Sequence, residues 1–241
     1  MLYRAHRGVT SYAPENTMPA FQLALEKNMD YIETDPCVTK DGKVILMHDP
    51  TINRTCRNKD GSVIPVPVFH KDLTYDELLE YDAGIAFGKE FAGTKIPLLE
   101  DLLSLAEGKD VIIALDKKIQ TEDVDILLDV VEKYNTKVCF STMDIERIKK
   151  IQERFPDALI DYDGPSTDEM LMEVTKLVKK ENLVIWMYLD KPNFSWLEQT
   201  RKVSEETLSC AKRYARVGIG NVNGTFDTIE ALSFCPDVVE L

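Results

Sequence analysis

The feature that most constrains the fold is a regular alternation of short apolar runs with segments of helical spacing. The strand-like runs are residues 2–5, 31–38, 44–47, 111–115, 138–140, 158–160, 183–188, 217–219 and 238–239. The helical patterns are residues 19–28, 98–106, 122–134, 144–155, 167–181 and 204–215. Strands and helices of these lengths in alternation predict parallel βαβ units.

One pair of runs breaks the alternation. Residues 31–38 and 44–47 are separated only by residues 39–43, too short a connection for parallel strands, and the Asp41-Gly42 pair is typical of a hairpin. If residues 44–47 form the returning arm, eight strands remain, the number that a closed (β/α)₈ barrel needs. We therefore expect an α/β fold: one TIM-barrel domain over residues 1–241, with a hairpin extension after strand 2 and residues 50–97 inserted above the barrel.

Composition excludes several classes of partner. The formal net charge of −13 and the lack of a cluster of basic and aromatic residues argue against a nucleic-acid partner. No apolar run approaches the roughly 18 residues of a membrane span, and the first residues have no signal-peptide pattern. Five cysteines without a CxxC pair favour reduced thiols. We expect a cytoplasmic protein, or a secreted one if a leader has been removed.

Polar residues follow the first two predicted strands. His6 and Arg7 stand at the end of strand 1, and Glu33 and Asp35 lie in strand 2. Residues two apart in a strand face the same side, so these carboxylates converge as half of a cation site. Oxygen ligands without nearby cysteine favour Mg²⁺ or Ca²⁺.

Two further patterns fall at strand ends. His48 follows the hairpin's return arm, which brings it back to the level of the carboxylates, and Asp49 can orient its imidazole or cap the turn. Asp116 ends the third barrel strand and can complete the metal site, while Lys118, two residues on, can meet a phosphate oxygen.

These patterns suit one chemistry. Barrel enzymes place catalysis at the carboxyl ends of their strands, where all the patterns lie. Phosphodiester hydrolysis needs a Lewis acid, a base for the nucleophile and an acid for the leaving alkoxide. Histidine suits both proton roles, because its unperturbed pKa is about 6.5. A phosphodiesterase with His6 and His48 as its acid–base pair is the resulting hypothesis.

The run from His6 to Arg54, reading HRG, PENT, AF, ETD, TKDG and MHDPTINRT, resembles the glycerophosphodiester phosphodiesterase family. The later DLTYDEL, IPLLEDLL, ALDKK and FSTMD segments follow that family's order. The resemblance implies a barrel of the phosphatidylinositol-phospholipase-C type with one divalent cation, Mg²⁺ or Ca²⁺. It also implies a small-molecule glycerophosphodiester substrate and the products sn-glycerol 3-phosphate and an alcohol, with glycerol and lipid metabolism as the setting.

The family pattern also implies roles for individual residues. Glu33 and Asp35 bind the metal, His6 and His48 exchange the proton, and Arg7 and Lys118 hold the phosphate. The attacking group is either the glycerol 2-hydroxyl or a water.

The sequence departs from the family pattern at three points. The third metal ligand is usually Glu, and the aligned residue here is Asp116. The family's Trp-Thr-x-Asn becomes residues 220–223, which keep only Asn223, so a wall of the substrate pocket has changed. The sequence ends at Leu241, where the family continues into a closing helix, so we expect another segment or a partner to cover that face.

Simpler structural alternatives remain for several residues. Asp116 can be a helix N-cap or an ion-pair partner of Lys117, and Arg7 can be a structural bridge. Trp186, at the end of the sixth strand, is a candidate for lining the substrate pocket, and core packing is the alternative. The pair Glu15 and Asn16 is expected to fix the loop and the helix entry rather than to touch substrate.

Two other functions stay open. A lysophospholipase-D-like or sphingomyelinase-D-like phosphodiesterase would need an apolar rim, for which residues 63–69 are the candidates. A catalytically inactive paralogue that binds metal or phosphate is the other alternative, because Asp116 and residues 220–223 are altered.

Overall fold

The computed structural model describes residues 1–192, 195 and 197–241. Its chain divides into two compact units. We call Ala5–Lys137 the amino-terminal unit, and Met1–Arg4 with Val138–Leu241 the carboxyl-terminal unit.

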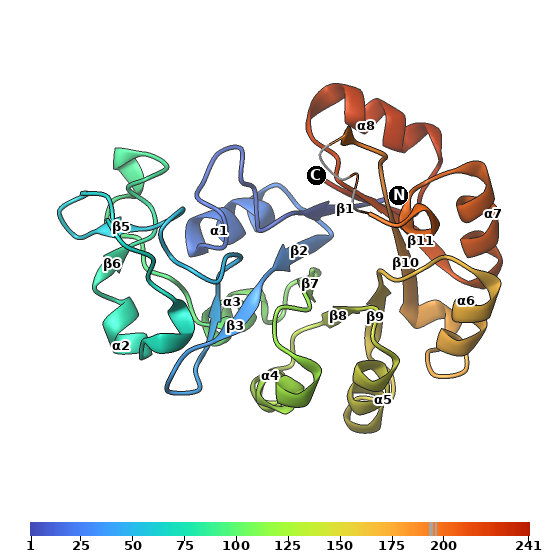
Figure 1. Ribbon diagram of the computed structural model, residues 1–241, viewed down its shortest axis with the longest axis horizontal. Helices are drawn as coiled ribbons and strands as arrows, with labels where there is room; N and C mark the ends of the chain where they lie inside the picture. Colours follow the sequence, from blue (N-terminus) through green and yellow to red (C-terminus); the bar gives the residue numbers. More distant parts are fainter. Residues whose placement is uncertain (193–194, 196) are drawn as a thin grey trace. The chain divides into compact units, whose positions relative to one another are not determined.

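The amino-terminal unit contains a pair of parallel strands flanked by helices (Figure 1). Strands β2 (Tyr31–Thr34) and β7 (Ile112–Leu115) pair in register, with Glu33 opposite Ala114. The helices are α1 (Met18–Glu26), α3 (Leu99–Ala106) and α4 (Val124–Val131), with a 3₁₀ turn at Thr121–Asp123. Their apolar faces are buried, including Phe21 of α1 and Leu102 of α3.

The predicted hairpin is present in this unit. Strands β3 (Pro36–Val38) and β4 (Val44–Leu46) pair antiparallel, with Pro36 opposite Leu46. The expected single strand over residues 31–38 is divided in two at Asp35. Because Pro36 has no backbone N–H to donate to a ladder, the chain can leave the parallel sheet at this point.

The inserted segment packs around a core of its own. Helix α2 (Tyr75–Leu78) has a capping box from Thr74 and Glu77, and β5 (Arg57–Asn58) pairs with β6 (Tyr81–Asp82). Two 3₁₀ turns, His70–Asp72 and Lys89–Phe91, complete the segment. Its core also takes in residues of the hairpin; the buried members are Cys37, Ile45, Met47, Ile52, Cys56, Ile64, Leu78, Ala83 and Ile96.

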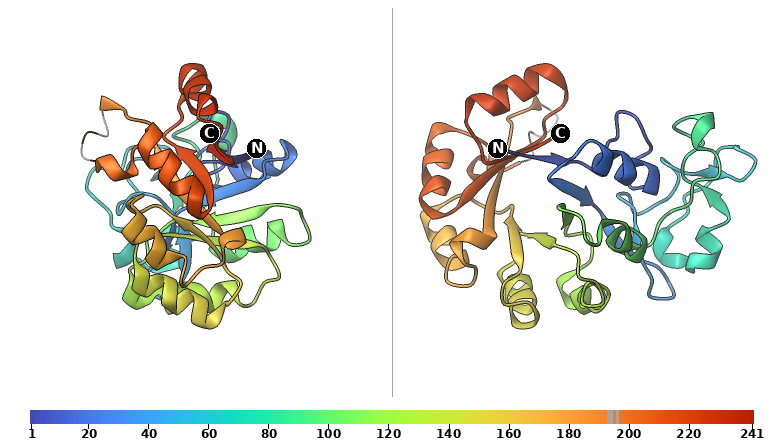
Figure 2. Two further views of the ribbon diagram at one scale, coloured as in Figure 1. Left: turned by 90° about the vertical axis from the view of Figure 1, so that its right-hand side faces the viewer. Right: turned by 180° about the vertical axis from the view of Figure 1, so that it is seen from behind.

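The carboxyl-terminal unit is a run of parallel strands with helices on one side (Figure 2). Its strands are β8 (Val138–Thr142), β9 (Leu159–Tyr162), β10 (Leu183–Tyr188), β11 (Arg216–Gly220) and β12 (Val238–Glu240), and β12 pairs with Leu2–Arg4 of β1 (Leu2–Ala5). Its helices are α5 (Ile145–Arg154), α6 (Asp168–Val174), α7 (Glu205–Tyr214) and α8 (Gly224–Ser233), with 3₁₀ turns at Lys180–Asn182 and Gln199–Arg201.

The strands run in the order β1-β12-β11-β10-β9-β8-β7-β2, the order of a closed eight-stranded parallel barrel. The expected (β/α)₈ fold class is therefore confirmed. Within the described ranges, no helix is long and apolar enough to cross a membrane.

One helix was predicted too long, and another was missed. The helix expected over residues 167–181 ends at Val174, where the hydroxyl of Thr175 donates to the carbonyl of Leu171 and the chain tightens into a turn. Helix α8 was not predicted at all. Its first residue is Gly224, at φ +83°, so the usual signs of a helix start are weak there.

Candidate active site

The turn after β1 is held to the second strand. Arg7 has a positive φ of 58°, which is uncommon for a residue with a side chain, and its backbone N–H donates to Glu33 Oε2 at 2.8 Å. The next residue, Gly8, has φ +86°, and a Cβ atom there would lie 2.7 Å from the Cβ of Ala20. The sequence Arg7-Gly8 thus fits a tight turn pressed against helix α1, and strain of this kind clusters at functional sites.

Two buried carboxylates lie beside this turn. Glu33 Oε2 is 4.0 Å from His6 Nε2, and the imidazole of His6 is about half exposed. Asp35 accepts a hydrogen bond from Asn16 Nδ2 at 2.7 Å and lies 3.4 Å from Arg7 Nε. Glu33 and Asp35 are only 2% and 1% exposed, so both depend on these partners.

The loop before α1 binds Asp35 through Asn16. The side-chain oxygen of Asn16 accepts from Thr34 Oγ1 at 2.8 Å, and its nitrogen donates to Asp35. Asn16 has φ 53°, a conformation that asparagine tolerates better than most residues. Its backbone N–H donates to the carbonyl of Arg7, so this loop and the turn after β1 are one hydrogen-bonded unit.

The hairpin returns His48 to the level of the carboxylates, as its geometry predicts. The N–H of Met47 donates to the carbonyl of Asp35 at 2.9 Å, so the return arm ends beside the residue that follows β2, and His48 is the next residue in the chain. His48 Nδ1 lies 2.7 Å from Asp49 Oδ1. Because a carboxylate only accepts, Nδ1 carries the proton, and Nε2 is left to exchange protons with another group.

Arg54 joins this histidine to the turn after β1. Its guanidinium donates to both oxygens of Asp49 and both oxygens of Glu15. Glu15 in turn accepts from Arg7 Nη1 at 3.0 Å. Hydrogen bonding to Arg54 lowers the pKa of Asp49 to about 2, with His48 adding to the effect. Burial raises the pKa of Glu15, but hydrogen bonds and charges from Arg54 and Arg7 outweigh it, and the net pKa is lowered.

The end of β7 lies beside the end of β2. The N–H of Asp116 donates to the carbonyl of Thr34, which brings Asp116 next to the end of β2. Lys118 Nζ lies 3.6 Å from Asp35 Oδ1 and 3.8 Å from Asp116 Oδ2. The prediction that Lys118 and Asp116 share a side agrees with this arrangement.

The predicted metal ligands fit a hard cation by their chemistry. Glu33, Asp35 and Asp116 offer only carboxylate oxygens, and two of the three are buried. Among the residues that the structure describes, however, no three His, Cys, Asp or Glu side chains are gathered closely enough to hold a metal ion. The ammonium group of Lys118 instead lies between Asp35 and Asp116 and supplies positive charge there.

Trp186 is the one predicted site residue outside the amino-terminal unit. It is buried on β10, where a Cβ on Gly218 of the neighbouring strand would lie 2.7 Å from its ring. The guanidinium of Arg4 stacks 4.4 Å from the ring centre. Its contacts are those of a packed core residue, and a substrate role for Trp186 stays a prediction.

Sequence reasoning gave Arg54 no role. The residue was visible as the Arg of the TINRT run, five positions after Asp49. No local periodicity links it to Glu15, because the two lie 39 positions apart. Only the folded chain brings the two together.

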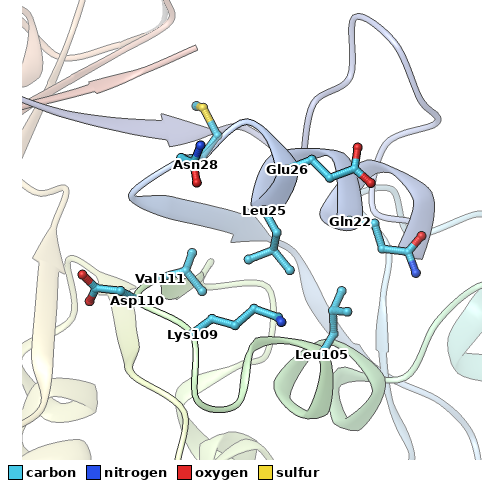
Figure 3. A pocket seen from close by; sticks show the side chains of 9 residues that line it. Gln22, Leu25, Glu26, Asn28, Leu105, Lys109, Asp110 and Val111 are labelled. Carbon is cyan, nitrogen blue, oxygen red and sulfur yellow. The ribbon is translucent and has the colours of Figure 1, made fainter.

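The amino-terminal unit has a hollow of about 550 Å³ between α1 and α3 (Figure 3). Leu25 and Leu105 line it, and Lys109 extends along it. It lies where the chain enters β2 and β7, since Met29 and Val111 also line it. Barrel enzymes carry their chemistry at the other end of their strands, so this hollow is not the candidate active site.

The chain is thus a (β/α)₈ barrel with a polar cluster at the carboxyl ends of its strands, the end where barrel enzymes carry their chemistry. Residues 6–182 match the model of the Glycerophosphoryl diester phosphodiesterase family. The chain belongs to this family, and the resemblance seen in its motifs is confirmed.

Individual relatives agree with this assignment. The chain is 34% identical over 158 residues to a glycerophosphodiester phosphodiesterase of Caldanaerobacter subterraneus subsp. tengcongensis, a match that covers 63% of this chain and 62% of that protein. It is 46% identical over 101 residues to a glycerophosphodiester phosphodiesterase of Bacillus altitudinis, covering 42% and 38%. The chain therefore spans less than two thirds of either relative.

A solved structure shares the fold over the whole chain. The phosphodiesterase of Oleispira antarctica, in complex with the product sn-glycerol-3-phosphate, has a TM-score of 0.78 and 18% sequence identity. The match covers 100% of this chain and 92% of that one.

Proposed function

We propose that this chain is a metal-dependent phosphodiesterase that hydrolyses glycerophosphodiesters to sn-glycerol 3-phosphate and an alcohol. The observation that carries the proposal is a pair of accessible histidines, each held beside a carboxylate: His6 beside Glu33 and His48 beside Asp49. Family membership supports the reaction class, and the product bound to the Oleispira antarctica relative supports the substrate class.

His6 and His48 serve as the acid–base pair. The hydrogen bond from His48 Nδ1 to Asp49 leaves Nε2 as the atom that takes or gives a proton. One histidine takes the proton of the attacking glycerol 2-hydroxyl or water, and the other returns a proton to the leaving alkoxide. Either histidine can be the base, with the other as the acid, because both offer an imidazole for proton exchange.

Arg7 and Lys118 bind the phosphate. Their cationic groups lie 3.4 Å and 3.6 Å from Asp35, so both are gathered at the carboxylates that would hold the cation. Glu33, Asp35 and Asp116 would hold Mg²⁺ or Ca²⁺. A bound divalent cation supplies Lewis-acid polarisation of a phosphate oxygen.

The test is a turnover assay of the purified chain on a panel of glycerophosphodiesters, with released glycerol 3-phosphate as the readout. We expect turnover with Mg²⁺ or Ca²⁺, loss on chelation, and recovery when the metal returns. His48→Ala should reduce turnover about 10²- to 10⁴-fold, the usual contribution of a general acid or base.

The third histidine provides the matched control. His70 lies in the inserted segment, and His70→Gln should keep wild-type turnover. Full activity in His48→Ala would overturn the acid–base assignment. Calorimetric binding of glycerol 3-phosphate without turnover on any substrate would identify an inactive phosphate-binding paralogue.

One observation favours a lipid substrate as the second candidate. Val63, Val66 and Phe69 are 68%, 62% and 41% exposed, which gives the inserted segment an apolar edge. Phe69 pairs with Thr51, three residues after His48, so this edge begins close to the candidate site. If lysophospholipids are the substrate, Val63→Ser with Val66→Ser should weaken turnover of lysophosphatidylcholine and leave glycerophosphocholine unaffected. Equal effects on both substrates would count against this alternative.

A further inference from the structure

We infer that Arg54 is a positioning residue that orients both His48 and Arg7, an inference that rests on the proposed function. Arg54 reaches both through two carboxylates, Asp49 and Glu15.

The geometry around Arg54 is a double fork. Nε and Nη2 donate to the two oxygens of Asp49 at 2.6 and 3.1 Å. Nη1 and Nη2 donate to the two oxygens of Glu15 at 2.7 and 2.8 Å. A guanidinium is planar and rigid, so two bidentate pairs fix both carboxylates relative to one plane.

Each carboxylate passes this orientation to a residue of the proposed mechanism. Asp49 Oδ1 accepts from Arg54 and also lies 2.7 Å from His48 Nδ1. Glu15 Oε1 accepts from Arg54 and also from Arg7 Nη1 at 3.0 Å. A single guanidinium therefore holds the tautomer of the histidine and the direction of the phosphate-binding arginine.

Stability alone does not account for this arrangement. The Arg54 side chain is 48% exposed, and exposed ion pairs contribute little to the free energy of folding. The bond network instead spans two separate segments, the loop that carries Glu15 and the turn that carries Asp49. It serves to fix the distance and angle between the histidine and the arginine.

The first experiment uses kinetics to separate the two arms of the network. The histidine arm runs from Arg54 through Asp49 to His48, and the arginine arm runs from Arg54 through Glu15 to Arg7. Asp49→Asn disturbs only the histidine arm and should lower kcat with little change in KM. Glu15→Gln disturbs only the arginine arm and should raise KM. Arg54→Met should do both, each by about tenfold to a hundredfold, the size expected for one charge-assisted hydrogen bond. Arg54→Lys keeps the charge without the fork, and should recover only part of the loss.

Coupling between the variants distinguishes positioning from an independent role. If Arg54 acts on the histidine through Asp49, the double variant Arg54→Met/Asp49→Asn has the kcat of Asp49→Asn alone. If the losses in kcat of the two single variants multiply in the double variant, the inference is overturned. Arg213→Met is the matched control, because Arg213 is 54% exposed and paired with a single carboxylate, Asp168. It should keep both kinetic constants.

A second readout does not depend on turnover. The chain has three histidines, so ¹⁵N-histidine spectra can be assigned with His48→Gln. In the wild-type chain His48 should show one tautomer, protonated at Nδ1, and in Arg54→Met a mixture of both. An unchanged tautomer in Arg54→Met would overturn the inference. If the wild-type chain has no activity on any glycerophosphodiester, the proposed function fails while this spectrum still tests the role of Arg54.

Discussion

Each unit of this chain contains an arginine bound to two carboxylates, but the two arrangements differ in what surrounds them. In the carboxyl-terminal unit, Arg4 pairs with Asp161 at 2.7 Å and Glu240 at 2.9 Å. Its side chain is 7% exposed and stacks on Trp186. In the amino-terminal unit, Arg54 is 48% exposed, and the carboxylates it binds each hold a further polar side chain.

The difference in exposure separates an ion-pair network suited to supporting the fold from one suited to the proposed chemistry. The Arg4 network is enclosed by barrel side chains, so its removal leaves charges buried without water. The Arg54 network ends on a histidine that reaches solvent, so its removal changes geometry at the surface. We therefore expect substitutions in the first to reduce stability, and substitutions around the second to reduce activity.

The largest expected effect is on activity in the amino-terminal unit. His6→Ala should reduce kcat/KM on a glycerophosphodiester about 10²- to 10⁴-fold, because it removes one partner of the proposed acid–base pair. The His6 side chain is 44% exposed, so the urea midpoint should change little. Kinetics and unfolding of the same preparation measure both. If His6→Ala instead loses much stability and keeps its activity, this region supports the fold rather than the chemistry.

The next effect is on stability in the carboxyl-terminal unit. Arg4→Met should destabilise the chain by about 3–5 kcal/mol, because it leaves buried carboxylates without their cation. Burial already raises the pKa of Asp161, against the opposing effect of Arg4. A raised pKa in the folded state means that stability is greatest below the ordinary pKa and is lost as pH rises through the folded value. The deficit of Arg4→Met should therefore be larger at pH 7 than at pH 4.

Urea unfolding at the two pH values measures this deficit. Arg213→Met serves as the control, because the Arg213–Asp168 pair is exposed and should cost below about 1 kcal/mol. Equal deficits for Arg4→Met at both pH values would show that lost packing, rather than an unpaired carboxylate, causes the instability.

The features that the sequence could predict are those encoded by neighbouring residues. The strand–helix alternation and the Asp41-Gly42 turn were sufficient for the barrel and the hairpin, because both are encoded by neighbouring residues. His6, Glu33 and Asp35 could be grouped because strand periodicity and strand ends bring them together. His48 could be added because the hairpin's length fixes where it returns.

The rest could not be read from local patterns. The division of residues 31–38 at Asp35 depends on Pro36 leaving the ladder, and α8 begins at a glycine. The Arg54–Glu15 bond joins two irregular loops, whose paths depend on packing rather than on periodicity. For Trp186 the sequence left pocket lining and core packing as alternatives, because the space that Gly218 on the neighbouring strand leaves for its ring depends on strand order and not on local pattern.

A smaller effect distinguishes the turns of the two units. Gly8 and Gly224 have nearly the same φ, +86° and +83°, but only Gly8 has atoms within 4 Å of a Cβ position. Gly224→Ala should cost about 1 kcal/mol for the left-handed conformation alone. Gly8→Ala adds overlap with Ala20 and should cost about 2–4 kcal/mol in total. Urea midpoints measure both, and equal costs would show that the α1 backbone yields to the extra methyl group.

The smallest effect concerns Asp49 and is confined to acid pH. Hydrogen bonding to Arg54, followed by His48, lowers the pKa of Asp49 to about 2. A lowered pKa means that its stabilising contribution is complete above the ordinary pKa, near 4, and disappears as pH falls through about 2. At pH 5 the Asp49→Asn variant should therefore be less stable than wild type. The difference should be under about 1 kcal/mol, because the Asp49–Arg54 pair is exposed to solvent. At pH 2 the difference should shrink. If it stays constant between these pH values, Asp49 contributes to stability through its shape rather than its charge, and the Arg54 network is not held together by ionisation.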